Sequence, residues 1–285
     1  MSTRIPYLDE VWNVTTGCGD DQVSPGCDNC YARRMFGRNL WRCPSCNDGM
    51  TFTLQTCSRC GDTGYQDFRP TFHADRLDQP LHWRKPRVVG VSFMGDLFHE
   101  AITNEQIHEV ILRTIQAHQH TYLILTKRPK RMRSFFIWLR DEYEFVPGNL
   151  WLGVTVCNQE EADRNITILL ATPAAKRLVS LEPLLSAINM RTGVYQMPPN
   201  GAARGTTLEG IDLVVLGGET GPGARPMQPD WALDVYRQCK AAGVAFWFKG
   251  MGRAKVPPRW DWSGAPGTEL LAEMQATHEL PAVRP

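Results

Sequence analysis

Residues 121–156 have the sequence TYLILTKRPKRMRSFFIWLRDEYEFVPGNLWLGVTV, and this stretch decides the fold class. It begins with a short apolar run, Thr121–Thr126, and ends with a second one, Leu150–Val156. Between the two runs, Pro129 suits the first turn of a helix. The residues after it form one apolar helical stripe, made of Met132, Phe135, Phe136, Leu139 and Tyr143. A strand, a helix and a second strand in this order predict a right-handed βαβ unit.

The same alternation continues on both sides of this unit. Capping residues mark three further helices: Thr103 with Gln106, Asn158 with Glu161, and Asp230, whose helix Gly243 closes. Seven strands alternating with helices predict an α/β fold, and a TIM-like (β/α) barrel, partial or full, is the expected closure. An open doubly wound sheet is the alternative. The other five strand candidates are Val11–Thr15, Arg87–Phe93, Arg177–Leu181, Asp212–Leu216 and Val244–Phe248.

Composition and charge limit the classes of protein to which this chain can belong. The chain has 285 residues, 42% hydrophobic and 21% charged, which is ordinary for a soluble globular protein. Its net charge of +1 argues against broad adhesion to a polyanion. We find no apolar signal region at the N-terminus and no run long enough to span a bilayer, so the expected location is the cytoplasm. Clustered cysteines in that compartment indicate metal or cluster ligands, since thiols stay reduced there.

Three cysteines directly follow the first strand candidate. Cys18, Cys27 and Cys30 are spaced C-x8-C-x2-C and alternate with glycine and proline, which allow a tight loop. Three thiolates on a [4Fe–4S] cluster leave one iron without a protein ligand, and that iron can bind a substrate or cofactor. The alternative is a zinc knuckle completed by His73 or His99.

A second group of cysteines has a different spacing. Cys43, Cys46, Cys57 and Cys60 form C-x2-C-x10-C-x2-C, two paired knuckles that can close a tetrahedral site. Zn²⁺ is the expected ion, and an auxiliary iron–sulfur cluster is the alternative. Such an insert either staples a loop or helps to dock a substrate.

Polar residues end nearly every predicted strand. Because parallel strands point their carboxyl ends to one edge, a ring of such residues predicts a ligand site there. Glu182 and Glu219 are candidates for ribose or substrate contact, and Cys157 is a candidate thiol or radical partner, with a packed core residue as the alternative. The strand-end candidates for cofactor binding are Met94, Gly95, Asp96, Thr126, Lys127, Thr155, Asn158 and Gln159.

Several strings together resemble a phage-protein family with a variant three-cysteine motif, which is similar to radical S-adenosylmethionine (SAM) enzymes. They are WNVTTGC, SPGCDNCYARR, FMGDLFH, LTKRP, WLGVTV, SLEPLL and GGETGPGARP, and they span about residues 11–252. The resemblance implies a barrel of the radical SAM type, partial or full. It also implies a [4Fe–4S] cluster on Cys18, Cys27 and Cys30, with SAM as cofactor. Met94-Gly95-Asp96 lies where those enzymes carry a strand end that binds the methionine ammonium of SAM.

The resemblance also implies a mechanism and a setting. An external one-electron reductant reduces the cluster, SAM is cleaved to methionine and a 5′-deoxyadenosyl radical, and the radical abstracts a hydrogen from the substrate. A phage association places the protein in the cytoplasm of a bacterial host. It favours a modified thymine in phage DNA as substrate, with isomerase chemistry during base hypermodification. The alternatives are a radical SAM enzyme acting on tRNA or a small nucleotide, and a non-enzymatic, zinc-dependent nucleic-acid-binding protein.

Two basic stretches agree with a nucleic-acid substrate, although each alone also fits a solvated helix face. One carries Arg33, Arg34, Arg38 and Arg42 among the aromatic residues Tyr31, Phe36 and Trp41, and the other carries Lys127, Arg128, Lys130, Arg131 and Arg133. The expected segments are 1–40 (first strand and cluster loop), 41–67 (four-cysteine insert), 68–251 (remainder of the barrel) and 252–285 (C-terminal extension). Within the barrel, residues 189–210 are expected to form a long loop.

Overall fold

The computed structural model describes residues 3, 5–36, 68–190, 208–252 and 272–281 except 275, with the backbone alone of 195–197 and 201–203. The four-cysteine insert, residues 41–67, lies outside the described residues. At the centre is a seven-stranded parallel sheet, which confirms the seven predicted strands to within a few residues at their ends. Its strands, in spatial order, are β1 (Glu10–Trp12), β4 (Val88–Val91), β5 (Thr121–Thr126), β6 (Leu150–Thr155), β7 (Lys176–Leu181), β10 (Leu213–Gly217) and β11 (Ala245–Gly250).

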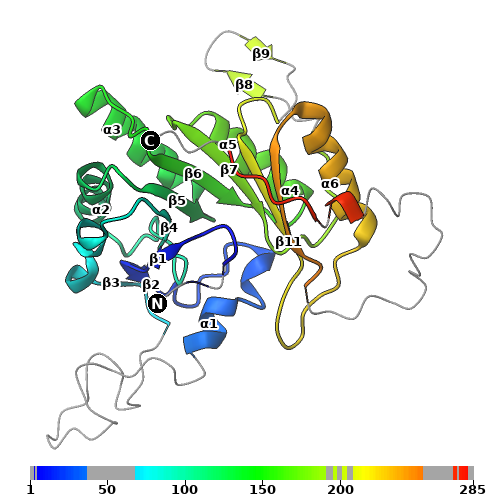
Figure 1. The fold of residues 1–285 in the computed structure, drawn as a ribbon, viewed down its shortest axis with the longest axis horizontal. Coiled ribbons are helices and arrows are strands. Elements are labelled where there is room, and N and C mark those ends of the chain that lie inside the picture. Colours follow the sequence, from blue (N-terminus) through cyan, green and yellow to red (C-terminus); the bar gives the residue numbers. More distant parts are fainter. Residues whose placement is uncertain are drawn as a thin grey trace, which may run out of the picture.

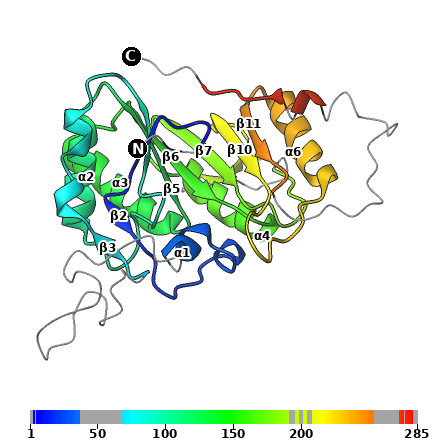
Figure 2. The ribbon, with the colours of Figure 1, turned by 60° about the horizontal axis from the view of Figure 1, so that its bottom comes forward.

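The strands lie side by side in chain order, and the order does not reverse anywhere in the described sheet. A doubly wound sheet needs such a reversal, so the alternative topology is wrong. The sheet curls into a half-barrel, which is compatible with a partial TIM-like barrel (Figures 1 and 2). The carboxyl ends of the strands therefore meet at one edge of the curl.

Helices cover the outer face of the curl. The capping box of Thr103 and Gln106, the cap at Asn158 and the closing Gly243 are all present. Apolar side chains of these helices pack with the outward residues of the strands in one large core. The helices are α2 (Asn104–Gln116), α3 (Pro129–Tyr143), α4 (Gln159–Glu161), a π-helical segment (Ala162–Ile166), α5 (Thr167–Leu170) and α6 (Pro229–Ala242).

The inner face of the curl carries a second, smaller core. Inward residues such as Leu123, Trp151 and Val215 pack there against Tyr7 and Leu8 of the N-terminal segment. The first strand is shorter than predicted, because the chain leaves it to form β2 (Thr15–Thr16), which pairs with β3 (Thr71–Phe72). Short helices follow at η1 (Pro25–Cys27), α1 (Tyr31–Phe36), η3 (Ala74–Arg76) and η4 (Gln79–His82).

Two further segments differ from, or add to, the predictions. The expected loop at 189–210 contains a small antiparallel pair, β8 (Tyr195–Met197) and β9 (Gly201–Ala203) (Figure 1). The C-terminal residues 272–281 run along the edge strand β11, where His278 bridges Trp247 and Met274 is fully buried. Within the described ranges, every helix is too short or too polar to cross a lipid bilayer.

Candidate functional site

A cavity of about 450 Å³ lies at the carboxyl ends of the strands. All three cysteines of the first group line it, together with residues that follow strands β4, β5, β7 and β10. The structure thus brings together, in one cavity, residues that are spread over more than two hundred positions in sequence. The strand-end candidates that line it are Gly95, Asp96, Thr126, Lys127, Thr155, Glu182 and Glu219.

The three thiols project from the segment between β2 and the start of α1, and all three are free and partly exposed. Gly17 and Gly19 have φ values of 80° and 60°, the left-handed region that favours glycine. This conformation lets the N–H groups of Cys18 and Gly19 both donate to the carbonyl of Phe68. A Cβ placed at Gly17 would lie 2.2 Å from the carbonyl oxygen of Arg69, so the loop passes this close to residues 68–69 only because residue 17 is glycine.

The donor set fits a [4Fe–4S] cluster with one open iron. Three soft thiols face one cavity, and no fourth cysteine or histidine of the described chain lines it. The histidines that a zinc knuckle would need are engaged elsewhere: His73 Nε2 lies 2.7 Å from the Thr16 hydroxyl, and His99 Nε2 lies 2.9 Å from Asp21. Burial, reinforced by the nearby Asp96 carboxylate, raises the pKa of Cys18 to about 12. A thiolate at this position therefore needs a positive partner, which a metal centre supplies.

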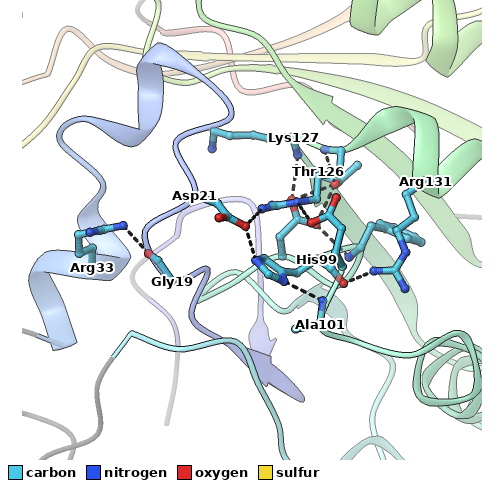
Figure 3. A network of polar contacts seen from close by, with 12 residues as sticks. Gly19, Asp21, Arg33, His99, Ala101, Thr126, Lys127 and Arg131 are labelled. Carbon is cyan, nitrogen blue, oxygen red and sulfur yellow. Dashed lines mark hydrogen bonds and ion pairs between the residues drawn. The ribbon is translucent and has the colours of Figure 1, made fainter.

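Lys127 provides positive charge beside the same thiols. Burial acts to lower the pKa of Lys127, but Cys27, Cys157 and Cys30 outweigh it, and the net pKa is raised. Figure 3 shows the Lys127 side chain extending from the end of β5 towards the N-terminal segment that carries the cysteines. The ammonium is therefore held charged where a cluster or an anionic ligand group would lie.

The carboxylate of Asp96 is fully occupied. It accepts hydrogen bonds from the Phe98 N–H (3.0 Å), the Thr126 hydroxyl (2.8 Å), the Lys127 N–H (3.1 Å) and the Arg128 guanidinium (3.3 Å). A carboxylate has about four lone-pair positions, so little capacity remains for a ligand ammonium. Asp96 thus joins the ends of β4 and β5 and fixes the wall of the cavity.

Arg128 extends this network to the loop that carries the three cysteines. Its buried guanidinium also contacts Asp21 (3.2 Å), which lies between Cys18 and Cys27, and Glu100 (2.8 Å) (Figure 3). Asp21, His99 and Glu100 lie close enough together to hold a metal ion. The guanidinium already contacts two of them, so the geometry favours an ion-pair network over a cation site.

Glu219 also has a positioning role in the structure. Its carboxylate accepts from the Arg225 side chain (2.7 Å), the Arg225 N–H (2.8 Å) and Asn29 (2.9 Å). Burial acts to raise its pKa, but these donors dominate and hold the pKa of Glu219 below its usual value. Arg225 in turn bonds Asp28 and the carbonyl of Pro25, so this group clamps the loop that carries Cys27 and Cys30.

Glu182 and Lys249 form an ion pair across the cavity wall, with Glu182 Oε1 2.7 Å from Lys249 Nζ. The other carboxylate oxygen accepts from the hydroxyls of Tyr7 (3.4 Å) and Ser180 (3.2 Å). Burial, and then the charge of Glu182, raises the pKa of Tyr7 above its usual value. Sequence patterns gave no signal for Tyr7, which lies 175 residues from its partner.

Four candidates lie away from the cavity surface. Met94 is buried against Ala32 and Phe36. Cys157 is fully buried behind the three-cysteine loop, 3.6 Å from the Ser24 hydroxyl, and burial raises its pKa to about 11. Asn158 caps α4, and Gln159 bonds to the backbone of Asn189.

Most of the described arginines in the two basic stretches form hydrogen bonds within the protein. Arg34 donates to the carbonyls of Thr220 and Pro222, and Arg33 bonds Asp20 and the carbonyl of Gly19. Arg131 donates to the carbonyl of His99 (Figure 3) and to the carbonyl of Ile102. These guanidinium groups fix loops around the cavity. Arg38, Trp41 and Arg42 lie outside the described residues.

Comparison with known proteins gives a family and no activity. No curated protein and no solved structure matches the chain significantly. The profile of a family described as "Protein of unknown function (DUF5131)" matches residues 2–274, which is nearly the whole chain. The chain therefore belongs to this family.

Proposed function

We propose that the protein is a radical SAM enzyme. One observation carries the proposal: three free thiols share a cavity of about 450 Å³ with residues at the carboxyl ends of a curled parallel sheet. The ends of barrel strands are where enzymes of this architecture place their chemistry, and the volume suits a cofactor of moderate size. The resemblance of the sequence strings to radical SAM enzymes supports the same conclusion.

The residues have distinct roles in this proposal. Cys18, Cys27 and Cys30 hold a [4Fe–4S] cluster, which when bound supplies one electron, taken from an external donor, to the sulfonium of SAM. Lys127 stabilises negative charge beside the thiols and is the candidate partner for the SAM carboxylate. The Asp96 and Glu219 networks hold the cluster loop at its two flanks, so that cofactor and substrate meet in a fixed geometry.

Anaerobic reconstitution tests this proposal. Protein rebuilt with iron and sulfide should be brown, absorb at about 400 nm and carry about four irons per cluster. With SAM and a strong reductant it should form methionine and 5′-deoxyadenosine. Cys18→Ser, Cys27→Ser and Cys30→Ser should each abolish both results, whereas Cys239→Ser, in the buried core away from the cavity, should retain them. A colourless, zinc-only protein that never cleaves SAM would refute the proposal and favour a zinc-dependent binding protein.

For the substrate we propose a modified thymine in DNA, with an isomerisation as the reaction. The aromatic residues Tyr31, Phe68 and Phe93 line the cavity beside the thiols, and aromatic side chains stack nucleobases in enzymes that act on a flipped base. Incubation of the reconstituted enzyme with hypermodified phage DNA, followed by digestion to nucleosides, should reveal a new nucleoside. If the enzyme instead converts tRNA or a free nucleotide, that molecule is the substrate and the proposal of a DNA base is wrong. The four-cysteine insert is proposed to bind Zn²⁺, which metal analysis would detect alongside the iron.

A further inference from the structure

The Glu182–Lys249 pair is built across a strand. The two residues belong to the ends of β7 and β11, and β10 lies between these strands in the sheet. Gly217, at the end of β10, makes their contact possible. A Cβ at residue 217 would lie 3.1 Å from Glu182 Oε1 and 3.4 Å from Lys249 Cβ. The cavity wall is therefore shaped so that one carboxylate and one ammonium sit next to each other, 2.7 Å apart.

The pair keeps hydrogen-bonding capacity that faces the cavity. Glu182 accepts hydrogen bonds from Tyr7 and Ser180 through Oε2, and its Oε1 forms the ion pair with Lys249, so one of its about four lone-pair positions stays open. Lys249 has three N–H donors, and Glu182 is its only hydrogen-bonding or ion-pairing partner in the part of the chain that the structure describes. Its side chain is 36% exposed and lines the cavity. The wall thus offers a strong donor directly beside a strong acceptor.

Two tyrosine side chains line the same cavity as this pair. The ring of Tyr7 lies under the Lys249 ammonium, 6.0 Å from its centroid, and is otherwise buried. Tyr31 is 46% exposed, lines the cavity, and donates its hydroxyl hydrogen to the carbonyl of Phe93. Since Tyr31 directly follows Cys30, a flat ligand stacked on it would lie beside the proposed cluster.

We infer that Glu182 and Lys249 read the imide edge of a pyrimidine base. The N3–H of thymine would donate to Glu182, and the adjacent O4 would accept from Lys249. Neighbouring donors and acceptors on a base edge are matched in proteins by such paired groups. Modification at C5 leaves this edge unchanged, so a hypermodified thymine presents the same pattern. This assignment rests on the proposed function, because it names the residues that select its substrate.

Binding of thymidine and 3-methylthymidine to the full-length, cluster-free protein tests the inference by calorimetry. The methyl group removes the N3–H donor and leaves the rest of the base in place. Wild type should bind thymidine about tenfold or more tightly than 3-methylthymidine, as expected for a hydrogen bond to a charged group. Glu182→Ala should bind the two nucleosides with equal affinity. Lys249→Met should bind thymidine about tenfold more weakly than wild type does. If circular dichroism shows that Glu182→Ala does not fold, Glu182→Gln replaces it. This variant should show a smaller difference in affinity between thymidine and 3-methylthymidine than wild type does.

Lys176→Met is the matched control. Lys176 pairs with Asp212 at 3.0 Å where strands β7 and β10 begin, at the end of the sheet away from the cavity. The Lys176→Met variant should therefore leave both affinities unchanged. Equal binding of the two nucleosides to wild type, or no binding of either, would overturn the inference. So would a tenfold rise in the KM for SAM in Lys249→Met assayed without substrate, since the pair would then serve SAM. Failure of the proposed function appears separately, as a reconstituted wild type that cleaves no SAM.

Discussion

At the scale of single residues, three carboxylates at strand ends have three different surroundings. The lone pairs of Asp96 are filled by two backbone N–H groups, a hydroxyl and a guanidinium, and those of Glu219 by Arg225 and Asn29. Only Glu182 pairs with a lysine that retains donors for a ligand. A carboxylate at a strand end is therefore a ligand contact only when its acceptors are not already used by the fold.

Replacing Arg128 should test the Asp96 network. The side chains of Arg128 and Asp96 are each 7% exposed, so Arg128→Met leaves a buried carboxylate without its counter-charge. We expect the free energy of unfolding of the cluster-free protein to fall by about 3–5 kcal/mol in urea titrations. Arg140→Met, whose partner Asp141 is on the surface, should cost less than about 1 kcal/mol. A loss for Arg128→Met as small as that of the control would show that the network does not stabilise the fold.

The clamp at Glu219 should make stability depend on pH. The folded pKa of Glu219 is lowered, because hydrogen bonds from Arg225 and Asn29 outweigh the opposing effect of burial. Its contribution is therefore complete above the unfolded pKa of about 4.3 and is lost as the pH falls through the lower, folded value. Glu219→Gln should be less stable than wild type by about 1.5–3 kcal/mol at about pH 6, and this difference should shrink below about pH 4. A difference that stays constant on acidification would contradict the assignment.

At the scale of elements, the sequence predicted the strands and helices that have a periodic pattern, and it did not predict the very short elements. The seven strands are continuous apolar runs, and the capped helices between them carry 3.6-residue periodicity, so both were recognisable. Strands β2 and β3 have two residues each, and no pattern of that length is distinctive. The π-helical turn Ala162–Ile166 carries no sequence signal that distinguishes it from an α-helix. The β8–β9 pair lies in a Gly- and Pro-rich stretch that favoured a loop.

The contact between the β4 end and the cluster loop should be sensitive to one methyl group. A Cβ at Gly95 would lie 2.9 Å from the Gly17 carbonyl oxygen and 2.9 Å from the Thr16 carbonyl carbon. Gly95→Ala should therefore displace the cluster loop, cost about 1–3 kcal/mol and lower the iron bound after reconstitution. Gly148→Ala, where a Cβ has no neighbour within 4 Å, should change stability by less than about 0.5 kcal/mol. Full iron content in Gly95→Ala would show that the loop tolerates the shift.

At the scale of the whole molecule, the sequence predicted where the candidate site lies. It did not predict which strand-end side chains are available to a ligand there. Strand ends of a parallel sheet meet at one edge, which is why the ring of polar residues converges on one cavity. Which of them face the cavity depends on partners far away in sequence, such as Tyr7 for Glu182 and Asn29 for Glu219. Such pairings leave no local pattern, so the sequence did not show that the Asp96 carboxylate accepts from the Lys127 N–H at the end of the neighbouring strand. The hydrogen bond from the Glu161 N–H to Asn158 is local, and the sequence predicted it as a helix cap.

An open half-barrel also has two edge strands, and the C-terminal segment covers one of them. Phe248 donates its N–H to Thr277, Glu279 donates to Phe246, and Met274 is fully buried against the outer core. If this docking stabilises the whole molecule, Met274→Ala should lower the free energy of unfolding by about 2–5 kcal/mol. Leu81→Ala, at a side chain that is 41% exposed, should cost much less. A loss below about 1 kcal/mol for Met274→Ala would show that burial of this side chain does not stabilise the whole molecule, and that only the backbone hydrogen bonds to Phe246 and Phe248 cover the edge strand β11.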